Sequence, residues 1–196
     1  NRFVAAAGRA EFEAQVVVVA MGKYQRPAVP ALASGLRADI LSLHASEYRN
    51  ARQLQSRGVL VVGAGNSGAD LALEAARAGH KTWLAGRPTG EIPFRPESFA
   101  GRHFLGPLVL GFAFKHVLTV RTPLGRRARL GQRSRGGVLI RVKSRDLAAA
   151  GVERTARVAG VRDGLPLLDD GRVLDVGNVL WCTGFNAGSD WIDLPV

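Results

Sequence analysis

The chain has 196 residues, 46% of them hydrophobic, with 24 glycines and a formal net charge of +11. This composition is typical of a globular α/β protein and excludes an intrinsically disordered one. The single cysteine, Cys182, excludes an intrachain disulfide framework, so we expect a reducing, cytoplasmic environment.

The first predicted element is the apolar run Val16–Ala20. A continuous run of β-branched residues is typical of a strand that is buried on both faces of a parallel sheet. The next segment, residues 24–57, has several turn-forming residues and little periodicity. It is therefore predicted to be a connector with one short helical turn at most.

A strand, a turn, a helix and a second strand follow in order. Val59–Val62 is predicted to be a buried strand that leads directly into the glycine-rich turn Gly63–Gly68. Residues 69–78 are rich in Ala, Leu and Glu, which favour a helix, and Gly79 is placed to end it. Lys81–Ala85 is predicted to be the next strand. Together these elements predict one βαβ unit.

The turn has the pattern G-x-G-x-x-G between a strand and a helix, which is the context that a dinucleotide-binding turn requires. In such a turn the first glycine permits a tight bend, the second lets a pyrophosphate approach the main chain, and the third lets the helix pack against the strand. The helix N-terminus then favours the phosphate charge. A turn that serves only helix–strand packing is the alternative. The residues predicted to bind the cofactor are Gly63, Ala64, Gly65, Asn66, Ser67 and Gly68, with Asn66 and Ser67 as side-chain donors.

The end of the next strand indicates which dinucleotide is bound. A site for NADH usually has Asp or Glu there to bind the ribose hydroxyls, whereas this chain has Ala85-Gly86-Arg87. A guanidinium can pair with a 2′-phosphate, which a carboxylate would repel. Arg87 therefore predicts NADPH, and Arg95 is a second candidate for the same contact. A solvated surface arginine is the alternative.

An apolar segment and a basic segment follow. Residues 99–120 are predicted to be helical, and their most apolar part, residues 104–114, is shorter than the roughly 20 residues that span a bilayer. Between Arg121 and Arg145 there are nine Lys or Arg residues and no Asp or Glu. This combination could contact an anionic membrane surface, and a solvated basic face is the alternative. No nucleic-acid-binding motif accompanies it, so nucleic acid is not an expected partner.

The last third of the chain predicts short elements. Residues 144–150 are predicted to be a helix capped by Ser144 and ended by Gly151. Residues 152–161 and 165–175 are predicted to be strands, with a turn at Asp170-Gly171. A final buried strand, residues 179–182, ends at Thr183-Gly184. Residues 12–24 and 174–185 are similar to each other, since each has an apolar strand, a small-residue turn and an aromatic residue.

Four motifs carry a resemblance to a known family. They are Val18–Tyr24 followed by two prolines, His44–Tyr48, Val59–Asp70 and Trp181–Phe185. In these motifs the chain resembles the middle of the flavin-containing monooxygenase-like family of two-dinucleotide-domain flavoproteins. It departs from the family's pattern at Met21, where Thr is usual. The family's first G-x-G-x-x-G, which binds FAD, has no counterpart near Asn1, so we expect a fragment that lacks most of the FAD site.

The resemblance implies an α/β fold with a Rossmann-like, three-layer NADPH domain, flanked by partial segments of an FAD domain. Residues 1–50 would be the end of a first FAD segment with a hinge, residues 51–184 the NAD(P)H domain and residues 185–196 the return to the FAD domain. Thr183 and Gly184 would contact a cofactor.

The implied activity is that of an FAD- and NADPH-dependent oxidoreductase, in which NADPH reduces the flavin and the flavin activates O₂ to oxygenate a small organic substrate. Two alternatives remain, an NAD(P)H-dependent flavin reductase and a non-catalytic nucleotide-binding fragment that has lost activity. No residue of the sequence is assigned as a catalytic acid or base, or as a metal ligand. His44 and Tyr48 are expected to be structural, and Cys182 is expected to be a small core residue.

Overall fold

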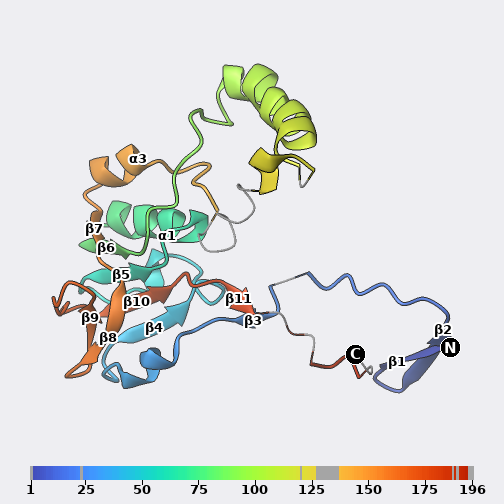
Figure 1. Ribbon diagram of the computed structural model, residues 1–196. Helices are drawn as coiled ribbons and strands as arrows, with labels where there is room; N and C mark the ends of the chain where they lie inside the picture. The colour runs from blue at the N-terminus through green and yellow to red at the C-terminus, as the bar shows by residue number, and fades with distance from the viewer. Residues whose placement is uncertain are drawn as a thin grey trace. The chain divides into compact units, whose positions relative to one another are not determined.

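The computed structural model describes residues 2–22, 24–119, 121–126, 137–186, 188 and 190–193 (Figure 1). Contacts between residues divide the chain into two units. The larger unit is Ala28–Gly184, and the smaller unit consists of the two ends of the chain, up to Pro27 and from Phe185.

The larger unit is built on a five-stranded sheet in which every neighbouring pair is parallel. All five strands therefore end at the same edge of the sheet. This sheet confirms the predicted α/β fold class, and it begins before the domain boundary predicted at residue 51. The strands in spatial order are β4 (Leu41–His44), β10 (Asn178–Trp181), β5 (Val59–Val62), β6 (Thr82–Ala85) and β7 (Glu153–Thr155).

Both faces of the sheet are covered (Figure 1). Helices α1 (Asn66–Arg77) and α3 (Ser144–Ala149) pack on one face. The short helix η1 (Ala31–Gly35) and the hairpin of β8 (Val158–Arg162) and β9 (Leu165–Leu168) contribute to the core on the other face. Alternate residues of a strand point to opposite faces, which is why β5 is apolar at every position and why β10 and β6 are apolar after their first residues, Asn178 and Thr82.

Strand β4 corrects the prediction that residues 24–57 are only a connector. Leu41–His44 pairs along its whole length with β10, and the indole Nε1 of Trp181 donates to Ser42 Oγ at 2.8 Å. The four residues Leu-Ser-Leu-His are too short and too mixed to stand out in the sequence, and only their pairing with β10 makes them a strand. One more short helix, η2 (Ala51–Gln53), follows in this segment.

Two local predictions near the end of the unit are also corrected. Lys143, rather than Ser144, is the N-cap of α3, because the Asp146 carboxylate reaches back to the Lys143 N–H at 3.0 Å. The turn that joins β8 to β9 is Asp163-Gly164, both with positive φ. The predicted turn at Asp170-Gly171 exists, but it follows β9.

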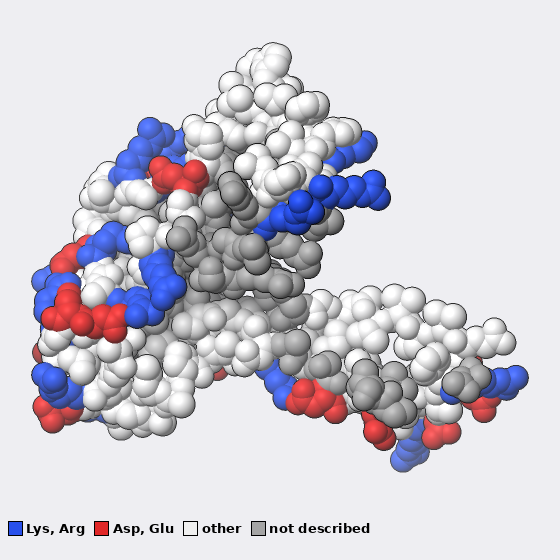
Figure 2. All heavy atoms as spheres, in the orientation of Figure 1, with Lys and Arg blue, Asp and Glu red and all other residues white. Residues whose placement is uncertain are grey.

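The predicted helix after residue 99 is present, although it is wound mainly as a wide π-type helix. It consists of η3 (Gly101–Leu105) and η4 (Leu108–Val117). Large apolar side chains on it are exposed, among them Phe104 and Phe112. In Figure 2 this segment carries Lys and Arg but no acidic side chains. Among the described residues, no helix is long and apolar enough to cross a membrane.

The predicted membrane contact of this segment stays a prediction. Part of the basic stretch, residues 127–136, lies outside the described residues.

The smaller unit holds two short antiparallel pairs. One pairs β1 (Phe3–Ala7) with β2 (Ala10–Ala14), and the other pairs β3 (Arg26–Pro27) with β11 (Phe185–Asn186). The prediction of a buried strand at Val16–Ala20 is wrong for this structure, since Val18 is 82% exposed and no described segment pairs with this run as a strand. A strand is buried on both faces only where neighbouring strands and covering layers exist.

The two similar segments of the sequence end in similar local structures. Gly22 and Gly184 have φ angles of +69° and +84°, a region that favours glycine. The strands that follow them, β3 and β11, pair with each other. The aromatic rings of Tyr24 and Phe185 meet edge to face with centroids 5.2 Å apart.

Candidate nucleotide-binding site

The glycine-rich turn lies at the point where the order of the strands reverses. From β5 the chain continues through α1 to β6 and β7 on one side, whereas β10 lies on the other side of β5. In open parallel sheets, ligands bind at the carboxyl ends of the strands at such a switch point. Gly63–Gly68 follows β5 there, and Thr183 and Gly184 follow β10.

Gly63 can be replaced by no other residue without strain. Its φ is +111°, and a Cβ at this position would lie 2.3 Å from the carbonyl oxygen of Cys182. Its N–H donates to the Ala85 carbonyl at 2.9 Å. The first glycine therefore bends the chain tightly between the ends of β10 and β6.

Gly68 and Gly65 differ sharply in their surroundings. A Cβ on Gly68 would lie 1.7 Å from the Gly63 carbonyl oxygen, so the first turn of α1 packs directly on the turn that precedes it. A Cβ on Gly65 would meet nothing within 4 Å, and Gly65 has an ordinary negative φ of −78°. The packing of the protein thus requires Gly68 but not Gly65. The open side of Gly65 leaves the main chain accessible to a ligand, as a pyrophosphate cradle requires.

The N-terminus of α1 has no competing anion of its own. Gly65 is its N-cap, no side chain caps it, and its first turn carries no acidic residue. Ser67 is exposed there. The side chain of Asn66, in contrast, holds another segment: Nδ2 donates to the Val138 carbonyl and Oδ1 accepts from the Ile140 N–H, both at 2.9 Å. The roles of Asn66 and Ser67 as phosphate donors stay predictions.

Arg87 is exposed and begins the loop after β6. The preceding residue, Gly86, has a φ of +138°, and a Cβ on it would lie 3.0 Å from the Ala64 backbone nitrogen. The chain therefore passes directly against the glycine-rich turn just before Arg87. This places the origin of the Arg87 side chain beside the turn. Arg95 instead pairs with Asp146 at 2.7 Å.

Thr183 and Gly184 are tied into the fold. Thr183 Oγ1 donates to the Ala28 carbonyl at 2.5 Å. The Gly184 carbonyl accepts from the Ala28 N–H at 3.0 Å and from His44 Nε2 at 2.9 Å. These bonds fix the turn after β10, and contact of either residue with a cofactor stays a prediction.

His44 and Tyr48 support the sheet and helix α1. His44 is only 1% exposed, and its Nδ1 faces Ser46 Oγ at 2.8 Å. The hydroxyl of Tyr48 donates to Glu74 Oε1 on α1 at 3.1 Å. Burial, followed by the Glu74 carboxylate, raises the pKa of Tyr48. Both side chains therefore have structural contacts.

Cys182 lies under the turn, half-buried. Burial raises the pKa of its thiol to about 12, so the thiolate that would act as a nucleophile is disfavoured at neutral pH. Within the described part of the chain, no three His, Cys, Asp or Glu side chains group as metal ligands.

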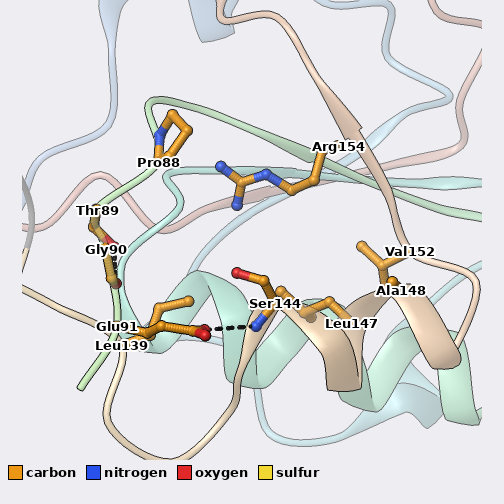
Figure 3. Close-up of a pocket in the computed structure, with 10 residues that line it drawn as sticks. All are labelled: Pro88, Thr89, Gly90, Glu91, Leu139, Ser144, Leu147, Ala148, Val152 and Arg154. Atoms are coloured by element: carbon orange, nitrogen blue, oxygen red, sulfur yellow. Dashed lines mark hydrogen bonds between the residues drawn. The ribbon is translucent and has the colours of Figure 1, made fainter. Parts of the chain in front are cut away.

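A cavity of about 230 Å³ lies beside the loop that follows Arg87 (Figure 3). One of its lining residues, Arg154 on β7, extends over it toward Pro88. Arg154 could not be predicted as a site residue from the sequence, because no local motif marks it and only the pairing of β7 with β6 brings it here. The lining residues are Pro88, Thr89, Gly90, Glu91, Leu139, Ser144, Leu147, Ala148, Val152 and Arg154.

Known proteins resemble this chain over nearly all of its length. Residues 1–93 match the family described as pyridine nucleotide-disulphide oxidoreductases. Over 188 residues the chain is 30% identical to an uncharacterized CzcO-like oxidoreductase from Geobacillus kaustophilus, covering 94% of this chain and 51% of the relative. Over 79 residues it is 37% identical to an indole-3-pyruvate monooxygenase from Oryza sativa, covering 40% of this chain and 20% of that relative.

A solved structure has the same fold. The FAD-bound cadaverine monooxygenase from Erwinia amylovora matches 91% of this chain and 46% of its own, with a TM-score of 0.54 and 16% identity. The chain shares the fold of this structure, and relatives that match nearly all of it are described as oxidoreductases. Together with the motifs, they confirm its resemblance to the flavin-containing monooxygenase-like family. The chain spans about half the length of the curated relatives that it matches from end to end.

Proposed function

We propose that the unit Ala28–Gly184 binds NADPH as part of an FAD- and NADPH-dependent oxidoreductase of the flavin monooxygenase type, with the two ends of the chain belonging to an FAD domain. The main support is the contrast within the turn. Gly63 and Gly68 are required by the packing of the protein, whereas the space beside Gly65 is open. An open glycine at a switch point, before an uncapped helix, fits a pyrophosphate.

Each part of the site has a separate task in this proposal. The main chain of Gly63–Gly68 and the start of α1 would hold the pyrophosphate, and Arg87 would pair with the 2′-phosphate. Thr183 and Gly184 would contact a cofactor at the end of β10. When bound, NADPH and FAD supply the hydride and the reactivity toward O₂, whereas the protein binds and orients them and excludes water. The substrate would be a small organic molecule, and the location would be cytoplasmic.

A flavin reductase without oxygenation and a non-catalytic nucleotide-binding fragment would use the same turn. The three functions differ in their products. NADPH oxidation with an oxygenated sulfide or amine indicates a monooxygenase, and NADPH oxidation without one indicates a reductase. Binding of NADPH without turnover, even when FAD is supplied, indicates the non-catalytic alternative.

The proposed nucleotide site is tested with Gly65→Ala and a matched control, Gly160→Ala. A Cβ meets nothing within 4 Å at either position, and Gly160 lies on β8, in the hairpin. In calorimetric titrations with NADPH and NADH, we expect Gly65→Ala to weaken both nucleotides by about tenfold or more, since one lost charge-assisted contact is worth roughly that much. Gly160→Ala should bind like the wild type. Unchanged binding by Gly65→Ala would refute the site.

A further inference from the structure

Arg154 reaches the site from the strand next to β6. In the parallel pairing of β6 with β7, Arg154 lies opposite Leu84. Its Nη2 atom is 3.4 Å from the carbonyl oxygen of Gly86, the residue that precedes Arg87. Gly86 in turn packs against the backbone of Ala64. In space, therefore, Gly86 alone links the Arg154 guanidinium to the glycine-rich turn.

The charge of Arg154 has no counterion among the described residues, because no described carboxylate lies within 4.0 Å of its guanidinium. Its neighbour Glu153 pairs with Arg172 at 3.2 Å. The nearby carboxylate of Glu91 accepts from the Ser144 N–H at 2.9 Å (Figure 3). Arg154 is an exposed residue, but partial burial of its guanidinium lowers its pKa, so the cation has lost part of its hydration. A bound anion would compensate this loss.

The cavity beside Arg154 has room for such an anion. Its volume of about 230 Å³ is several times the ~30 Å³ that one water molecule occupies in the liquid. Leu139, Leu147 and Val152 form apolar walls. Thr89 and Ser144 contribute hydroxyl-bearing side chains to the lining. The cavity is partly enclosed and mainly apolar, and the Arg154 guanidinium, which has no carboxylate partner among the described residues, favours a compact anion there.

We propose that Arg154 is a second guanidinium for the 2′-phosphate of NADPH, and that the cavity beside it receives this phosphate together with Arg87. This inference rests on the proposed nucleotide function and adds a specificity-determining residue to it. A phosphate monoester carries nearly two negative charges at neutral pH, so two cations from neighbouring strands match it better than one. NADH has a hydroxyl in the same place and gains little from either arginine.

The test uses Arg154→Gln and Arg154→Lys, with Arg162→Gln as the control. Arg162 is an exposed arginine on β8 and does not line the cavity, so its replacement removes the same charge elsewhere. Calorimetric titrations give the dissociation constants of NADPH, NADH and 2′,5′-ADP. We expect Arg154→Gln to weaken NADPH and 2′,5′-ADP by about ten- to a hundredfold, and NADH by less than about twofold. Arg154→Lys should recover part of the loss, and the control should change nothing.

A purely structural role gives a different pattern. If Arg154 only supports the Gly86 carbonyl, its replacement weakens NADPH and NADH equally, or neither, and the inference fails. Because both arginines contact one phosphate in this account, their losses in the Arg87→Gln, Arg154→Gln double variant should not add. Full additivity would overturn it. Failure of the wild type to bind either nucleotide would instead refute the proposed function itself.

Discussion

The imidazole Nε2 of His44 lies 2.9 Å from the carbonyl oxygen of Gly184. Since a carbonyl only accepts, Nε2 donates, and Nδ1 is left to accept from the Ser46 N–H at 3.2 Å. This bond connects the end of β4 to the turn after β10. It joins two of the four motifs that carry the family resemblance.

Replacement of His44 should loosen this connection. We expect His44→Ala to lower the free energy of unfolding by about 1–3 kcal/mol, because a buried hydrogen bond and packing are lost together. His44→Gln, whose amide can donate to the same carbonyl, should lose less. Urea unfolding followed by circular dichroism measures both. Equal stability of all three proteins would show that the bond contributes nothing.

Replacement of Gly68 should lower the stability of the protein, whereas replacement of Gly65 should affect nucleotide binding alone. Gly68→Ala forces a Cβ to within 1.7 Å of a backbone oxygen, so we expect a loss of about 1–3 kcal/mol or more. Gly65→Ala should leave stability within about 0.5 kcal/mol, because the position is open. Thermal unfolding of the two variants tests this order. A stable Gly68→Ala would mean that α1 does not pack against the turn as described.

Arg87 should select NADPH over NADH. Arg87→Ala removes the guanidinium that follows β6, so we expect weaker NADPH binding by about tenfold or more and nearly unchanged NADH binding. Fluorescence titration of each reduced nucleotide provides the two dissociation constants. Equal losses for NADPH and NADH would contradict the assignment of Arg87 to the 2′-phosphate.

The thiol of Cys182 should react slowly with thiol reagents as long as the protein is folded. Burial raises the pKa of its thiol from 9.0 to about 12, so at pH 8 the folded protein has roughly a thousandfold less thiolate than an unfolded chain. Native protein should react with Ellman's reagent far more slowly than urea-unfolded protein. Fast reaction of native protein at pH 8 would mean that the thiol is not buried.

The same shift predicts a pH dependence of stability. A raised pKa in the folded state means that the protonated thiol is favoured there, and this stabilisation is intact below the unfolded pKa of about 9. It is lost as the pH rises toward about 12. Wild type should therefore lose stability relative to Cys182→Ala across this range. Parallel stability curves of the two proteins would contradict the shift.

Local signals in the sequence were enough to predict the central βαβ unit. Val59–Val62 and the turn after it are recognisable because burial on both faces and the glycine spacing are both properties of neighbouring residues. Leu41–His44 and Arg154 were missed, because the first is a strand only through β10 and the second reaches the site only through the order of the strands.

At Val16–Ala20 the sequence predicts a buried strand that the structure does not contain. Its composition shows that it can form a buried strand, but burial depends on partners that no local pattern encodes, and Val16 is 75% exposed. The turn at Asp163-Gly164 was missed for a related reason. Both Asp-Gly pairs in this region form turns, and only the pairing of β8 with β9 decides which one closes the hairpin.

Binding of NADPH by the turn Gly63–Gly68 is the proposal on which the other predictions about cofactors depend. Equilibrium titration of the wild-type chain with NADPH and NADH, under the same buffer and salt conditions, tests it most directly. We predict saturable binding with one nucleotide per chain and at least about tenfold preference for NADPH, as expected for one charge-assisted phosphate contact. No binding of either nucleotide, or equal affinity for both, would contradict the account.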